Sequence, residues 1–164
     1  MEISEKQIRY DRDSFEILVY TYENKLYRTA LTLMGNRADA EDMVQDAFIK
    51  LYEKQPEFES TEHEKAWLIR VTINLCKNRL RSSWWKKTES LLDSYPWVDT
   101  QQDELINTVM ELPTKYRIVI LLYYYEGYSS KEIAEIIGKN DAAVRQLLSR
   151  ARKELKNYLE GELW

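Results

Sequence analysis

Helix-breaking residues are scarce in this chain and stand at the ends of apolar repeats. Of 164 residues, only four are glycine and three are proline. Apolar residues recur with the 3.6-residue period of an α-helix along most of the chain, and Gly35, Gly127 and Gly138 each follow such a run. A sandwich or barrel of short strands needs more turns than so few breakers supply. The sequence therefore predicts an all-α fold.

The helical pattern falls into two blocks. It is lost over residues 85–102, whereas 10–84 and 103–160 each carry several apolar stripes. This organisation predicts two small helical domains joined by a flexible linker. A linker of this length is expected to let the two domains sample many separations in the free chain.

Composition excludes several classes of site. Cys76 and His63 are the single cysteine and the single histidine, which leaves no disulfide framework within the chain and no paired-histidine or cysteine-rich metal site. Cys76 lies on an apolar stripe and is expected to be an inert buried thiol, while His63 is expected on the surface. With no basic-then-apolar leader and no long apolar run, the chain is interpreted as a soluble, cytoplasmic protein that uses no metal or cofactor.

Charge is strongly segregated although the net charge is only −4. Residues 37–61 hold three basic and seven acidic side chains, and residues 62–87 hold seven basic and two acidic ones. Residues 139–156 are again basic, six against two. Ordinary solvated helix faces are one interpretation, but the alternation also suits a chain whose faces meet partners of different sign.

Residues 129–156 have the layout of a helix-turn-helix. Ser129 and Glu132 form a capping box, Gly138 ends a short helix, and a longer basic helix follows over about 141–159. The alternative is an amphipathic hairpin with a solvated basic face, but the capped first helix favours DNA binding. The candidate DNA-contacting residues in and before the second helix are Lys139, Asn140, Arg145, Gln146, Ser149, Arg150, Arg152 and Lys156. Arginine can read guanine in the major groove, whereas a lysine further along the helix suits phosphate.

A second polar face with nucleic-acid chemistry lies on a helix expected over 61–82. Thr61 and Glu64 resemble a capping box at its start. The residues of this polar face are Arg70, Asn74, Lys77, Asn78 and Arg81. Asparagine offers a donor and an acceptor to base edges, and the flanking cations can hold phosphates. Trp67 on the same helix could stack a base, but core packing is the favoured interpretation.

An acidic face is predicted on a helix over about 39–54. Asp42, Gln45 and Asp46 surround the aliphatic Ile49 on the side away from the apolar stripe. Such a face repels DNA and suits a protein partner with basic residues. Paired carboxylates could also indicate acid–base chemistry or a metal, but no histidine or third carboxylate at ligand spacing accompanies them.

Five motifs in order resemble those of bacterial extracytoplasmic-function sigma factors. Asp39-Ala40-Glu41-Asp42-Met43-Val44-Gln45-Asp46-Ala47-Phe48 is similar to the family's Asp-Ala-Glu-Asp-Leu-Val-Gln-Glu-x-Phe signature. Trp67-Leu68-Ile69-Arg70-Val71-Thr72-Ile73-Asn74 and the Lys77, Asn78 and Arg81 that follow resemble the promoter-melting helix. Leu112-Pro113-x-x-Tyr116-Arg117, Tyr128-Ser129-x-x-Glu132-Ile133-Ala134 and Val144-Arg145 with Arg150-Ala151-Arg152 resemble the second domain.

The resemblance implies a non-enzymatic sigma factor that binds core RNA polymerase and promoter DNA, with an anti-sigma factor as a further partner and no small-molecule substrate. Asp42, Gln45, Asp46 and Ile49 then match the polymerase-binding positions. The implied minus-ten residues are Phe58, Glu59 and Ser60, in the loop that captures a flipped base, with Arg70, Asn74, Lys77, Asn78 and Arg81. The basic helix of the second domain is implied to read the minus-thirty-five element.

Two other classes remain as alternatives. A helix-turn-helix regulator could bind DNA without joining polymerase, but it would not need the acidic face around Asp42 and Asp46. A helical adaptor between proteins would leave both basic faces unexplained.

Overall fold

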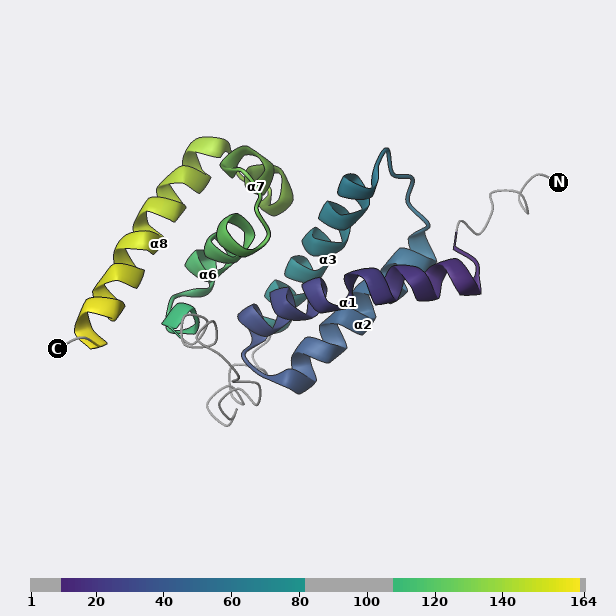
Figure 1. Cartoon of the computed structure of the whole chain (residues 1–164), viewed down its shortest axis with the longest axis horizontal. Helices are drawn as coiled ribbons and strands as arrows, with labels where there is room; N and C mark the ends of the chain where they lie inside the picture. The colour runs from purple at the N-terminus through teal and green to yellow at the C-terminus, as the bar shows by residue number, and fades with distance from the viewer. Residues whose placement is uncertain (1–9, 82–107, 163–164) are drawn as a thin grey trace.

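The computed structural model of the protein describes residues 10–81 and 108–162, and every regular element in these two ranges is a helix (Figure 1). The elements are α1 (Arg12–Met34), α2 (Arg37–Lys54), α3 (Thr61–Arg81), α6 (Thr114–Ile120), η3 (Leu121–Tyr125), α7 (Ser130–Ile137) and α8 (Asp141–Glu162). The all-α prediction is thus confirmed, while the predicted linker over 85–102 lies outside the described residues. In the described ranges, no helix is both long and apolar enough to cross a membrane.

Helices α1, α2 and α3 pack on one another around the core of the first domain. Leu26 and Leu33 from α1, Leu51 from α2 and Ile69 from α3 are at most 1% exposed. Gly35 ends α1 in the left-handed region at φ 80°, where a side chain would be strained, and its N–H donates to Leu31 O. The periodic stripes of the sequence therefore become the shared core.

The start of α3 differs from the prediction. Ser60, rather than Thr61, caps this helix, because its Oγ accepts the N–H of His63 at 3.0 Å. Glu64 does not complete a capping box. Its two carboxylate oxygens instead accept the hydroxyls of Tyr10, at 2.8 Å, and Tyr22, at 3.0 Å. The Thr61–Glu64 spacing is therefore a coincidence of sequence, and Glu64 joins α3 to α1.

The second domain contains the predicted helix-turn-helix. The capping box at the start of α7 is present in both directions between Ser129 and Glu132. Gly138 ends α7 at φ 72°, and the Asn140 side chain caps α8 by accepting the N–H of Ala143 at 2.7 Å. Before α7 the chain widens into the π-helical turn η3, in which Glu126 N–H reaches back five residues to Leu121 O.

The two domains are packed against each other, through α6 on α1 and through α7 on α3. Helix α8 contacts α6 and α7 and lies on the far side of the second domain from α1–α3 (Figure 1). From the sequence we expect the two domains to sample many separations, whereas in this structure they are packed together. The length of a linker carries no information about contacts between the domains that it joins.

The two contacts between the domains are called seams below. Polar groups join the first seam, which lies between α1 and the second domain. The Arg117 guanidinium donates to the backbone carbonyl of Thr32 at 2.9 Å. Arg28 lies 3.6 Å from the Glu126 carboxylate, which is only 2% exposed. A carboxylate so deeply buried needs a nearby cation, so this ion pair depends on the domains staying together.

The second seam lies between α3 and α7. The Arg70 guanidinium donates to the backbone carbonyl of Glu135 at 3.0 Å, and the Lys65 ammonium lies 5.3 Å from the centre of the Tyr128 ring. Burial first, and then the charge of Glu126, raises the pKa of Tyr128, which is 7% exposed. A cavity of about 350 Å³ opens beside these contacts, lined by Trp67 among others.

Candidate functional site

The predicted acidic face of α2 is exposed to solvent. Asp42, Gln45 and Asp46 are all on the surface, and Ile49 is 53% exposed at the edge of the same face. Their positions follow from the helical period, because the intervening residues, including Met43 and Ala47, fill the core. An exposed apolar side chain beside carboxylates is an arrangement suited to a protein partner.

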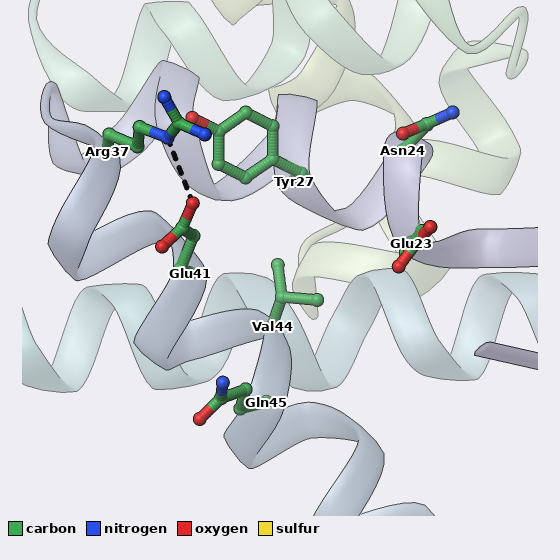
Figure 2. Close-up of a pocket in the computed structure, with 7 residues that line it drawn as sticks. All are labelled: Glu23, Asn24, Tyr27, Arg37, Glu41, Val44 and Gln45. Atoms are coloured by element: carbon green, nitrogen blue, oxygen red, sulfur yellow. Dashed lines mark hydrogen bonds and ion pairs between the residues drawn. The ribbon is translucent and has the colours of Figure 1, made fainter. Parts of the chain in front are cut away.

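A groove of about 580 Å³ adjoins this face, between α1 and α2 (Figure 2). Its lining residues are Glu23, Asn24, Tyr27, Arg37, Glu41, Val44 and Gln45. Within it, Arg37 Nε donates to Glu41 Oε1 at 3.0 Å, the dashed contact in Figure 2. Gln45 belongs to both the groove and the acidic face, so the two form one continuous surface.

Arg79 connects the end of α3 to this surface. Its guanidinium donates to Asp39 at 3.2 Å and lies 4.0 Å from Asp42. Asp42 is nevertheless 61% exposed, so its charge remains available to a partner. The contact joins the end of α3 to the start of α2.

The predicted nucleic-acid face of α3 is divided between open and covered residues. Asn74, Asn78 and Arg81 are exposed, and Arg70, although exposed, is held by Glu135 across the domain boundary. Lys77 is half-buried, and its pKa is lowered by burial first and then by the charges of Lys139 and Arg81. Lys139 belongs to the turn of the helix-turn-helix, so the two predicted DNA-contacting faces adjoin in this arrangement.

The loop before α3 has a more ordered role than the sequence suggests. The Phe58 ring is half-buried and meets His63 and Trp67 edge to face, with ring centres 5.2 and 5.8 Å apart. Glu59 is exposed, and its N–H donates to His63 Nδ1 at 3.3 Å. These contacts hold the loop against the first turns of α3.

A cavity of about 450 Å³ lies beside this loop. Its lining residues are Tyr10, Glu57, Phe58, Ser60, Thr61 and Glu64. Two of the three loop residues predicted to capture a flipped base, Phe58 and Ser60, thus line one cavity, while Ser60 also caps α3. Trp67 packs against the core, as the favoured interpretation of the sequence predicts.

The predicted DNA-contacting residues of the second domain are all exposed. They are Lys139, Asn140, Arg145, Gln146, Ser149, Arg150, Arg152 and Lys156. Some of them also have structural contacts, since Asn140 caps α8 and Arg145 lies 3.5 Å from Asp141 one turn earlier. Arg145 therefore stands near the N-terminal end of α8 with its guanidinium already oriented.

An aromatic pair that sequence reasoning missed contacts this face. Arg152 Nε donates to the hydroxyl of Tyr124 at 2.6 Å, and its guanidinium carbon lies 5.3 Å from the ring centre of Tyr123 and 5.6 Å from that of Tyr124. Both tyrosines belong to η3. The run of three tyrosines at 123–125 was a visible signal, but the π-helical turn that places two of them beside α8 was not.

The titratable groups give no indication of a catalytic or metal centre. Within 10–81 and 108–162, no group of three His, Cys, Asp or Glu residues is arranged to hold a metal ion. Burial raises the pKa of the Cys76 thiol to about 12, as expected for an inert core cysteine.

Comparison with known proteins identifies both domains. Residues 18–86 match Sigma-70 region 2, and residues 102–155 match Sigma-70, region 4. The ECF RNA polymerase sigma factor SigW of Bacillus subtilis (strain 168) is 31% identical over 94% of this chain and 94% of its own length. The ECF RNA polymerase sigma-E factor of Haemophilus influenzae is 30% identical over 92% of this chain and 89% of its own.

Solved structures agree on the fold. The sigma factor RpoE of Bartonella quintana, solved with the anti-sigma factor NepR, superimposes with a TM-score of 0.72 at 24% identity, over 90% of this chain and 98% of that one. CnrH, solved with the cytosolic domain of CnrY, superimposes with a TM-score of 0.68 at 25% identity, over 92% and 90%.

The chain belongs to the ECF family of RNA polymerase sigma factors. It is an alternative sigma factor, a class of non-catalytic regulators that direct transcription initiation with RNA polymerase.

Proposed function

We propose that the acidic face of α2, formed by Asp42, Gln45, Asp46 and Ile49, binds core RNA polymerase. The observation that carries this proposal is the exposure of Ile49 within a cluster of acidic and polar side chains. Carboxylates surrounding one aliphatic side chain match a basic partner surface with an apolar centre. The groove beside Gln45 extends the area over which the partner is held.

The exposed face of α3 is proposed to hold the melted minus-ten region. Asn74, Asn78 and Arg81 present amide and guanidinium groups to single-stranded bases and phosphates. The cavity at Phe58 and Ser60 is proposed to take a flipped base, with Glu59 at its rim. Arg70 and Lys77 complete this face once the second domain moves away from α3.

The basic face of α8 is proposed to read the minus-thirty-five element. Arg145 and Gln146, near the N-terminal end of the helix, have the position from which base edges are reached in a helix-turn-helix. The later residues of the face, Ser149, Arg150, Arg152 and Lys156, suit phosphate contacts, and Lys139 and Asn140 lie in the turn before α8.

An anti-sigma factor is proposed as a further partner. The two structures compared above are complexes with a second protein, which is the anti-sigma factor NepR for RpoE and the cytosolic domain of CnrY for CnrH. The packed arrangement of domains, with Arg70 of α3 held against Glu135 of α7, is one that such a partner would stabilise by binding both domains at once.

Reversal of charge on α2 tests the polymerase contact. Asp42→Lys combined with Asp46→Lys is expected to abolish co-elution with core polymerase in gel filtration, because desolvated charge pairs at an interface contribute a few kcal/mol. Glu154→Lys, an exposed carboxylate on α8, is the control and should co-elute normally. Unchanged co-elution of the double variant would favour a helix-turn-helix regulator that acts without polymerase.

A further inference from the structure

The side chain of Arg152 contacts two tyrosines of η3. Its Nε–H donates to the Tyr124 hydroxyl at 2.6 Å, and the guanidinium carbon lies 5.3 and 5.6 Å from the ring centres of Tyr123 and Tyr124, which are themselves edge to face at 4.9 Å. Cation–π contact and the hydrogen bond together restrict a long side chain that would otherwise sample many rotamers. The Arg152 side chain is therefore held in one orientation before any ligand binds.

The rest of the guanidinium remains available. Among residues 10–81 and 108–162, the structure gives the four Nη–H bonds of Arg152 no acceptor, and the side chain is exposed. Tyr124 is 55% exposed, and because its oxygen accepts from Nε, its own O–H proton is still free to be donated. A guanidinium edge and a hydroxyl donor thus lie side by side, which is a site for an oxyanion.

The position along α8 decides which oxyanion fits. Arg152 follows Asp141 by about 16 Å along the helix axis, at 1.5 Å per residue, whereas the major groove of DNA is about 12 Å wide. A helix whose N-terminal residues enter the groove therefore carries Arg152 to the groove edge, where the sugar–phosphate backbone runs. The shared face of Arg145 and Arg152 keeps both on the DNA side of the helix.

We propose that Tyr124 and Arg152 together bind one backbone phosphate of the DNA, with Arg152 supplying the charge and Tyr124 acting both as its positioning residue and as a second donor. This inference rests on the proposed DNA-binding function of α8 and extends the contact surface onto η3. It assigns a role to the hydroxyl of Tyr124. It assigns none to the hydroxyl of Tyr123, because Tyr123 contacts Arg152 through its ring and not through its hydroxyl.

Fluorescence polarisation with a mixed-sequence DNA duplex tests the proposal, because a phosphate contact does not depend on sequence. The full chain is titrated at a series of low salt concentrations. Tyr124→Phe is expected to weaken binding about fivefold, and Arg152→Ala about tenfold with a salt slope smaller by about one phosphate. In the Arg152→Ala background, Tyr124→Phe should change the affinity less than about twofold, since the two act on one phosphate.

Tyr123→Phe is the matched control, because it removes a neighbouring hydroxyl while keeping both rings, and it should bind as the wild type does. Urea unfolding of each variant separates binding from stability. Wild-type affinity for Tyr124→Phe, or an unchanged salt slope for Arg152→Ala, would overturn the proposal while leaving DNA binding intact. Failure of the wild-type chain to bind the duplex at any salt concentration would instead overturn the proposed DNA-binding function.

Discussion

Arg70 on α3 donates a hydrogen bond of 3.0 Å to the backbone carbonyl of Glu135 on α7. A side chain on the proposed minus-ten face of one domain is thus held by the helix-turn-helix of the other. Lys77 of the same face also lies near Lys139 of the helix-turn-helix, but as a like charge that repels it, since the charge of Lys139 helps to lower the pKa of Lys77. The packed arrangement therefore uses residues that promoter DNA is proposed to need.

Arg28→Ala is expected to separate the two domains. It removes the cation 3.6 Å from the buried Glu126 carboxylate, and leaving such a carboxylate uncompensated costs about 3 kcal/mol or more. Exposing Glu126 to water by domain separation relieves that cost. Small-angle X-ray scattering should show a larger radius of gyration than for the wild type.

Arg12→Ala is the control for this separation, because the Arg12–Glu16 pair is exposed and joins residues of α1 only. It should scatter as the wild type does. Identical profiles for Arg28→Ala and the wild type would show that the α1 seam does not hold the domains together.

Asn74→Ala is expected to impair promoter opening more than promoter binding. Unpairing costs a few kcal/mol per base. The exposed amide of Asn74 is proposed to offset part of this cost by hydrogen-bonding to the single strand. Permanganate footprinting should show weaker thymine reactivity in the melted region, while co-elution with core polymerase stays normal. Full reactivity with this variant would remove Asn74 from the melting face.

Sequence periodicity was sufficient to predict the helices, because burial of one face at 3.6-residue spacing dictates most of their course. Gly35 and Gly138 ended helices as expected, and the Ser129–Glu132 capping box formed. At α3 the same reasoning failed. Ser60 and Thr61 are both residues that favour a cap, and Ser60 takes this position. The two carboxylate oxygens of Glu64 accept the hydroxyls of Tyr10 and Tyr22, and these contacts between distant residues are not visible in the local sequence.

The candidate surfaces were predictable as faces but not as contacts. Helical phase placed Asp42, Gln45 and Asp46 on the surface correctly. It could not indicate that Arg70 meets Glu135 or that Tyr124 holds Arg152, because both contacts join segments far apart in the chain. The second of these also depends on the π-helical turn of η3, which shifts the tyrosines out of α-helical phase.

Arg145 and Lys156 are expected to differ in what they recognise. Arg145→Ala should lower the free-energy preference for one or two minus-thirty-five base pairs by about 1–3 kcal/mol, the contribution of a bidentate contact. Lys156→Ala should weaken binding to all sequences alike, since a phosphate carries no sequence information. A panel of single-substitution promoters bound by each variant holoenzyme measures this. Identical shifts across the panel for both variants would mean that the two residues share one role.

Cys76 should react with a thiol reagent only when the first domain opens. Its pKa of about 12, against an ordinary value of 9.0, leaves at pH 8 roughly a thousandfold less thiolate than in the unfolded chain. Because the folded state retains this proton, the associated stabilisation is present below pH 9 and is lost as the pH rises toward 12.

Ellman's reagent should therefore react slowly with the native chain and rapidly in urea. Since the sequence has a single cysteine, the whole absorbance change reports on this site. A native rate equal to the rate in urea would place the thiol at the surface instead of in the core.

This chain is expected to recognise promoters as a subunit of RNA polymerase and not by itself. The direct measurement is a titration, at physiological salt, of the duplex promoter that the wild-type holoenzyme enriches from a randomised library. The free chain, with net charge −4 and Arg70 engaged by Glu135, should bind it weakly and with steep salt dependence. Core polymerase should convert this to tight binding that is sensitive to the spacing of the two promoter elements. Tight, sequence-specific binding by the free chain would contradict the account and favour a free-standing regulator.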